Sequence, residues 1–385
     1  MATGIKVEKI KEYKKLMFFM LLFFINIGVK ELFRVFNQSN TAVYVIILFL
    51  SLLSIVIIYP KINKKYVHLY FISLLFYIFL IISSFSNNNT EYGLQKAYLG
   101  LLLPLTMFFI FSKKNWKTEE VLKFLVITIL FLDFITILMK IRYGFWSRSV
   151  SFGFLGSITF GWLNGMAFLG TLLSTQKGIK KIFFSLFFLL MILWTGSKGP
   201  LVGLIIISTF LFYRYSRNKN KLLIFVLSIL AIAIAYIIII KYGENIRSVK
   251  MIIDFINSPD EYMEGVGQGS FGSRLENYKY SLTLFQNNIL LGVGFGNWQG
   301  DYMNYLYPHN IILELLSEIG VIGIILFFGL LLLIKYKNPV SLIGLFGCVT
   351  LMFSGDFSYF RYAFYLLLIG HYLSLNENTL YTTIF

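Results

Sequence analysis

The sequence predicts an all-α polytopic membrane protein, and three observations carry this prediction. The chain has 385 residues, of which 57% are hydrophobic and only 14% are charged, whereas soluble globular chains average about 25% charged residues. Apolar runs of about 20 residues recur along the whole chain, and each is long enough to cross the hydrocarbon core of a bilayer. The runs do not alternate as barrel strands do, so we expect their backbone groups to be satisfied within helices.

The apolar runs predict about 12 transmembrane helices in one membrane domain, residues 1–385. The predicted spans are residues 16–36, 41–59, 66–85, 94–111, 120–139, 150–174, 182–195, 200–213, 222–240, 311–334, 340–354 and 359–375. Residues 241–310 separate the ninth span from the tenth and are expected to form a large, helical extracytoplasmic loop. No small-residue cleavage site follows the first span, which predicts a retained helix and not a removed signal peptide.

Lysine and arginine mark every second connection between the predicted spans. The basic connections are the N-terminal segment and residues 61–65, 113–117, 177–181, 214–221 and 335–337, which together hold more than half of the 34 basic residues. Because such connections stay in the cytoplasm, we expect both termini to be cytoplasmic.

The opposite side carries a few basic residues that work against this bias. They are Lys140, Arg142, Arg148, Lys198 and those of the 241–310 loop. Long loops translocate regardless of their charge, which accounts for the last group but not for the residues on short connections. We therefore expect the set to serve a function.

Three other observations exclude or disfavour whole classes of function. The net charge of +16 does not indicate nucleic-acid binding, because the basic residues form short clusters between apolar runs. Cys348 is the only cysteine and lies within an apolar run, which excludes a disulfide framework and a thiolate metal site. The absence of an internal repeat disfavours a secondary transporter.

The long loop contains two predicted helices. Residues 241–256 form an amphipathic stretch that is expected to lie on the surface. Ser273 and Glu276 have the spacing of a capping box, which predicts a helix start with Arg274 in the first turn. The apolar face of that second helix is expected to hold Leu275, Tyr278, Leu282 and Phe285.

Glycines alternate after this second helix, at Gly292, Gly294 and Gly296. Alternate glycines let backbone amides approach a phosphate in nucleotide-binding loops. No strand precedes these residues and no helix follows them directly, so a tight re-entrant or interfacial turn is the favoured interpretation.

His309 stands at the start of the tenth span, on the predicted extracytoplasmic side. An unperturbed histidine titrates near neutral pH, which suits a general base, although a polar residue at the interface is an alternative. Asn310, Glu314 and Glu318 follow at i, i+4 and i+8 and so share one helix face. Carboxylates within a span are costly unless they pair with a cation, so we expect them to face the bundle. An ion pair that only fixes helix packing is the alternative to a functional role.

Together these motifs resemble the O-antigen ligase and O-antigen polymerase superfamily. In chain order they are Arg148 to Asn164, Thr195-Gly196-Ser197-Lys198-Gly199, Arg274, Leu291-Gly292-Val293-Gly294, His309-Asn310 and Glu318-Ile319-Gly320-Val321-Ile322-Gly323. Each motif is weak alone, whereas their order, spacing and side of the membrane are specific. The resemblance covers residues 148–330.

The resemblance implies a membrane glycosyltransferase of the GT-C type that uses lipid-diphosphate-linked sugars, with neither a metal nor another cofactor. It implies that His309 is the base for the acceptor hydroxyl and that Arg274 and Lys198 hold the diphosphate. Family members usually carry arginine at the position of Lys198, and lysine keeps the charge but loses the bidentate fork. The remaining predicted site residues are Glu318 as catalytic, and Arg148, Asn310, Glu276, Gly292 and Gly294 as substrate-binding.

We therefore expect a surface-polysaccharide polymerase in the bacterial cytoplasmic (inner) membrane. Its expected partners are an undecaprenyl-diphosphate-linked oligosaccharide, membrane lipids and a chain-length regulator, and no nucleic acid. Three alternatives stay open: a ligase that transfers polymer to lipid A core or protein, a flippase for lipid-linked sugars, and a non-enzymatic scaffold.

Overall fold

The computed structural model describes ten parts of the chain. They are residues 2–36, 49–54, 56, 64–86, 90–145, 152, 155–175, 178–215, 272–298 and 307–377. Within these parts all regular elements are helices, and a single isolated bridge joins Phe152 and Leu155. The prediction of an all-α protein is confirmed.

The elements run in the order α1 (Ala2–Phe36), η2 (Lys64–Tyr66), α3 (Val67–Phe85), α4 (Thr90–Ala97), η3 (Tyr98–Leu102), α5 (Leu103–Phe111), α6 (Thr118–Tyr143), α7 (Ser157–Leu173), α8 (Ile179–Trp194), α9 (Lys198–Tyr215), α13 (Gly272–Asn287), α14 (Ile311–Leu332), α15 (Pro339–Leu351), η4 (Phe357–Tyr359) and α16 (Phe360–Asn376). Elements α4, η3 and α5 follow one another without a break, and η3 is a π-helical turn.

Four helical segments in the described parts are long and apolar enough to cross a membrane: α3, the continuous segment Thr90–Phe111, α6 and α14. Helices α7 and α15 and residues Lys198–Leu211 of α9 are apolar but shorter. The protein is thus a helical membrane protein, and the figure of about 12 spans stays a prediction. Predicted span 222–240 lies outside the described residues, and span 41–59 is described only at 49–54 and 56.

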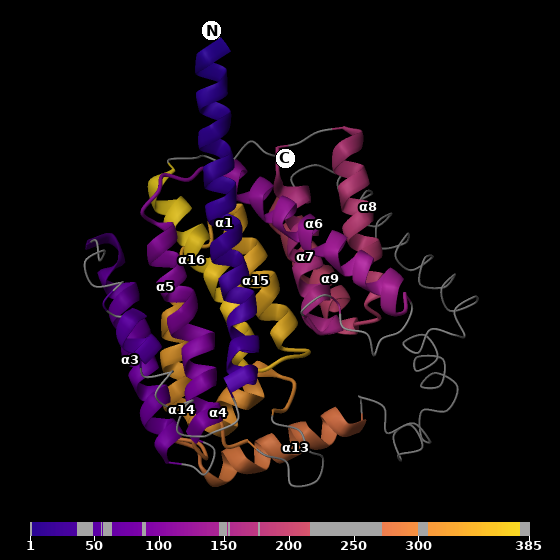
Figure 1. The fold of residues 1–385 in the computed structure, drawn as a ribbon. Coiled ribbons are helices and arrows are strands. Elements are labelled where there is room, and N and C mark those ends of the chain that lie inside the picture. The colour runs from indigo at the N-terminus through magenta and orange to yellow at the C-terminus, as the bar shows by residue number, and fades with distance from the viewer. Residues whose placement is uncertain are drawn as a thin grey trace.

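In the described parts of the chain, the lysine-bearing segments around Lys15, Lys114 and Lys335 meet at one end of the bundle, which we call the basic end. Lys15 on α1 contacts Glu120 on α6 at 2.9 Å. The Tyr372 hydroxyl donates to the Lys114 carbonyl at 2.9 Å. Helix α1 projects beyond the bundle at this end, and α13 lies across the opposite end (Figure 1). We call that opposite end the site end.

Helix α16 forms the centre of the bundle and is buried on every side, as expected for a helix that is apolar all round. It packs on α15 and α5. A Cβ built on Gly347 of α15 would lie 2.8 Å from the Ala363 Cβ, so glycine permits the close approach of the two helices. The one buried arginine of α16, Arg361, donates to the carbonyls of Asn26 and Ser358 at 2.7 and 2.5 Å.

Helix α13 confirms the second predicted helix of the long loop, but only part of the predicted apolar face packs: Leu275, Tyr278 and Phe285 are half-buried. The side chains that are buried are Asn277 and Ser281, whereas Leu282 is 45% exposed. The buried indole of Trp298 donates to the Ser281 hydroxyl at 2.8 Å. A buried N–H group requires an acceptor, and the Ser281 hydroxyl supplies it for Trp298. The face of α13 that carries Asn277 and Ser281 therefore turns toward the protein. The predicted surface helix at 241–256 lies outside the described residues.

Candidate active site at one end of the bundle

Helix α14 is interrupted at Gly320, where φ is 61° and ψ is −162°. The interruption leaves backbone groups without helical partners, and the preceding glycine-containing loop supplies them. Ile289 O accepts from Val321 N at 2.9 Å, and Val293 N donates to Ser317 O at 2.9 Å. The loop is therefore a tight turn whose backbone pairs with α14 on both sides of its break. This agrees with the interpretation of the alternate glycines as a tight turn.

The amides of this loop are used within the protein. Gly292 N donates to Asn288 O at 2.9 Å, and Gly294 N donates to Glu318 O at 3.0 Å. Gly296 N donates to the Glu318 carboxylate at 3.0 Å. The amides of Gly292 and Gly294 therefore serve the packing of the loop and α14 and are not turned toward a ligand.

Glu314 and Glu318 pair with a lysine from a distant part of the chain. Lys96 Nζ on α4 lies 2.5 Å from Glu314 Oε1 and 2.7 Å from Glu318 Oε2, and all three side chains are 0% exposed. The ammonium group also lies 4.7 Å from the centre of the Phe295 ring, within the range of a cation–π contact. The expectation that these carboxylates face the bundle and meet a cation is confirmed.

Residues 353–357, which we call the strap, connect α15 to η4 and cross the site end. The backbone N–H of Phe357 donates to the Glu314 carboxylate at 3.1 Å. The Tyr92 hydroxyl donates to Asp356 Oδ2 at 2.9 Å, and Asp356 Oδ1 also contacts the Ser358 hydroxyl. The strap is thus fixed by α14 on one side and by α4 on the other.

Arg274 and Lys198 approach the strap from two different helices. Arg274 Nη1 donates to Phe353 O at 2.9 Å. A Cβ built on Gly199, the neighbour of Lys198, would lie 3.7 Å from Phe353 Cβ, and the Lys198 and Arg274 charges are close enough to interact. Lys198 is exposed and Arg274 is half-buried. Within the described ranges neither residue forms a salt bridge, so the two cations form a site suited to an anion.

His309 lies immediately before α14, beside this pair of cations. Its φ of 62° is the only positive value of a non-glycine residue in the described parts, and such backbone conformations cluster at functional sites. The Tyr307 ring packs edge-on at 4.6 Å from the imidazole. Burial, and then the Arg274 charge, lower the pKa of His309 to about 4, against an opposing effect of Asp356. The imidazole is therefore neutral at pH 7 and has one unprotonated ring nitrogen.

The other predicted site residues that the structure describes do not gather beside His309, Arg274 and Lys198 as free polar groups. Asn310 is the N-cap of α14, and its Oδ1 accepts from the amides of Ile312 and Leu313 at 3.0 and 3.1 Å. Glu276 is exposed on α13, and Arg148 lies outside the described residues. Asn164, predicted to follow Arg148 in one motif, is buried in α7 and donates to Asp133 Oδ1 at 3.1 Å.

Sequence reasoning missed Lys96, Tyr92 and Asp356. Lys96 falls within the predicted span 94–111, and an ionisable residue inside a span is by default a candidate functional residue. That signal was present in the sequence. Tyr92 and Asp356 fall in short connections between the predicted spans and carry no comparable signal.

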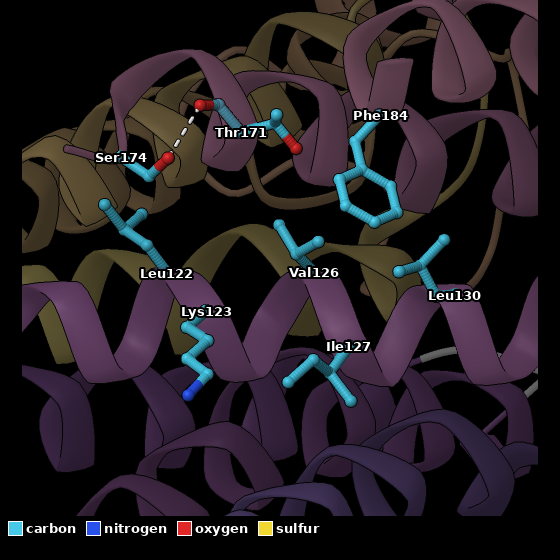
Figure 2. A pocket seen from close by; sticks show the side chains of 8 residues that line it. All are labelled: Leu122, Lys123, Val126, Ile127, Leu130, Thr171, Ser174 and Phe184. Atoms are coloured by element: carbon cyan, nitrogen blue, oxygen red, sulfur yellow. Dashed lines mark hydrogen bonds between the residues drawn. The ribbon is translucent and has the colours of Figure 1, made fainter. Parts of the chain in front are cut away.

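A small apolar cavity of about 110 Å³ lies away from this site, between α6 and α7–α8 (Figure 2). It is lined by Leu122, Lys123, Val126, Ile127, Leu130, Thr171, Ser174 and Phe184. The Ser174 hydroxyl donates to the Thr171 carbonyl at 2.8 Å. The Lys123 ion pair with Glu12 on α1 places the cavity toward the basic end, so the cavity does not belong to the site around His309.

The fold and this site define a helical membrane protein with a neutral histidine and two cations gathered at one end of the bundle. Residues 183–328 match the family model described as O-Antigen ligase. The match confirms the resemblance to the O-antigen ligase and polymerase superfamily, whose members are glycosyltransferase-like enzymes. It includes Lys198, Arg274 and His309, whereas Lys96 and Asp356 lie outside it. No curated protein matches the chain significantly.

Proposed function

We propose that the protein is a surface-polysaccharide polymerase that transfers glycan from a polyprenyl diphosphate to a lipid-linked acceptor. The observation that carries this proposal is the placement of two cations, Arg274 and Lys198, beside a neutral His309. A diphosphate leaving group and an acceptor hydroxyl need these two kinds of group within one site.

In the proposed reaction His309 takes the proton of the acceptor hydroxyl while that oxygen bonds to the anomeric carbon of the donor sugar. The bond between the anomeric carbon and the phosphate oxygen breaks, and its electron pair leaves with the diphosphate. The negative charge that develops there is stabilised by Arg274 and Lys198. Arg274 uses Nη1 on the Phe353 carbonyl, which fixes the direction of the guanidinium and leaves its other donors for phosphate oxygens.

The site end then faces the outside of the bacterial cytoplasmic membrane, and the basic end faces the cytoplasm together with both termini. This orientation is supported by the lysine-rich connections that meet at the basic end and by the orientation bias of such connections. An undecaprenyl-diphosphate-linked oligosaccharide is the proposed donor, and a chain-length regulator is a proposed protein partner.

The direct test is transfer by the purified protein. Detergent-solubilised enzyme is mixed with a polyprenyl-diphosphate-linked repeat unit, and the products are separated by size and identified by mass spectrometry. We expect a ladder of lipid-linked oligomers from the wild type and only the starting unit from His309→Ala. If the wild-type protein does not lengthen the glycan on the lipid, the proposal of a polymerase is refuted.

A ligase is the second candidate, because the matching family model is described as an O-Antigen ligase. A ligase uses the same donor but transfers the glycan to a different acceptor, and the polyprenyl diphosphate again leaves. Adding lipid A core or an acceptor protein to the same assay separates the two. Glycan that appears only on the added acceptor favours the ligase.

A further inference from the structure

The buried ion pairs of Lys96 are expensive features for a membrane protein. Among the described residues the cluster gathers three carboxylates, those of Glu314, Glu318 and Asp356, around one lysine, and each of these side chains is at most 1% exposed. Buried ion pairs often stabilise a fold no better than apolar residues of similar volume. The cluster around Lys96 is therefore better explained by the segments that it holds in place than by packing alone.

A continuous set of contacts leads from Lys96 to the phosphate-binding arginine. Lys96 Nζ pairs with Glu314 at 2.5 Å, and Glu314 accepts from the Phe357 amide at 3.1 Å. Phe357 ends the strap, and Phe353 at its other end accepts from Arg274 at 2.9 Å. Lys96 is thus connected to Arg274 through one carboxylate and the five residues of the strap, residues 353–357.

The same helix that carries Lys96 holds the strap at a second point. Tyr92 lies one turn earlier on α4 and donates to Asp356 at 2.9 Å. Asp356 is also close enough to His309 for their charges to interact. Helix α4 therefore holds the strap at two points, through Tyr92 and through Lys96, although it lies outside the matched family segment.

We propose that Lys96 is a positioning residue, which fixes the strap through Glu314 and thereby sets the geometry of Arg274 for the leaving diphosphate. This inference rests on the proposed function, and it adds a residue that neither the motifs nor the family match contain. A displacement of about 1 Å at such a site can lower the rate about 100-fold, so the support of the strap has a measurable effect on transfer.

The test compares Lys96→Met with a matched control, Lys123→Met. Lys123 forms an ion pair of 2.6 Å with Glu12, but the side chains are 49% and 48% exposed and lie toward the basic end. Both variants are purified, and their membrane insertion and thermal melting are recorded first. Hydrogen–deuterium exchange of the strap peptide then reports on its fixation without any need for activity.

We expect the strap amides to exchange at least about 10-fold faster in Lys96→Met than in the wild type, since exchange follows local opening. The strap in Lys123→Met should exchange as in the wild type. Unchanged exchange of the strap in folded Lys96→Met would overturn the inference, whatever the activity of the enzyme.

A double-mutant cycle with Arg274→Lys supplies the functional readout. If Lys96 acts through Arg274, the loss of kcat/KM in the double variant should fall short of the product of the two single losses by about 10-fold. Lys123→Met should combine with Arg274→Lys without such coupling. Multiplicative losses for Lys96→Met would show a general structural role and would also overturn the inference.

A variant at the next contact covers the case in which Lys96→Met does not fold. Glu314→Gln leaves Lys96 paired with Glu318 and keeps an oxygen for the Phe357 amide, but it removes the charge-assisted bond. For Glu314→Gln we also expect faster exchange of the strap amides and coupling with Arg274→Lys. Unchanged exchange or multiplicative losses in this variant would overturn the inference. If the wild type transfers no glycan, the proposed function fails, and the exchange measurement still decides whether Lys96 fixes the strap.

Discussion

Lys96 Nζ lies 2.5 Å from Glu314 Oε1 in the interior of the bundle, although the two residues are 218 positions apart in the sequence. The contact joins α4 to the first turn of α14, five residues after His309. On α4, Lys96 stands just before the π-helical turn Tyr98–Leu102. On α14, Glu314 stands before the break at Gly320. Irregular backbone at membrane depth is tolerated only where protein covers it, and here it brings charged groups beneath the site.

The diphosphate site is tested by substitutions at Arg274. Arg274→Ala should abolish polymer, and Arg274→Lys should restore only part of it, because lysine cannot form the bidentate contact. The chain-length distribution of the polysaccharide is read on gels. Lys279→Ala is the control, because Lys279 is an exposed cation on the same helix. Wild-type polymer from Arg274→Ala would mean that this arginine only anchors α13 to the strap.

The role of His309 is tested by its removal. His309→Ala should lower the transfer rate by about 10²- to 10⁴-fold, the usual contribution of a general base. Single repeat units should accumulate on the lipid carrier while protein amount and insertion stay unchanged. Near-normal chain lengths in this strain would exclude His309 as the base.

The activity should depend on pH in a way that reflects the burial of His309. Activity rises with pH through the pKa of the free base, and that pKa is lowered from 6.5 to about 4. The acid limb of kcat/KM should therefore lie well below pH 6.5. The same shift destabilises the fold as pH falls from 6.5 toward 4, because the unfolded chain binds the proton first. Thermal melting at each pH separates the two effects, and a limb at 6.5 or above in folded protein would contradict the assignment.

Metal removal tests the proposal that arginine and lysine alone meet the charge of the diphosphate. Transfer by the purified enzyme should continue in excess EDTA at an undiminished rate. A loss of activity that Mg²⁺ restores would indicate that a metal ion shares this task with Arg274 and Lys198.

The break in α14 is tested by Gly320→Ala. At Gly320 the backbone has φ 61° and ψ −162°, a region that is essentially restricted to glycine and costs other residues about 1–3 kcal/mol. A Cβ there would also lie 2.5 Å from the Leu290 carbonyl. We expect a lower melting temperature in detergent. Gly329→Ala on the same helix meets nothing within 4 Å and should melt like the wild type.

The sequence by itself determined the class of the protein, the helices and the two ends of the bundle. Hydropathy is a local property, so the apolar runs predicted α3, α6 and α14 directly. Charge is also counted locally, and the connections around Lys114 and Lys335 do meet at one end, where the Lys335 amide donates to His371 and Lys114 accepts from Tyr372.

Only the tertiary structure decided which charges meet. The sequence predicted that Glu314 and Glu318 need a cation, but it could not select Lys96, because the partner of a buried carboxylate is set by how helices pack. It also could not tell whether the amides of Gly292 and Gly294 face a ligand or the broken helix. That choice depends on the interruption at Gly320, whose unpaired backbone groups must find partners wherever water is excluded.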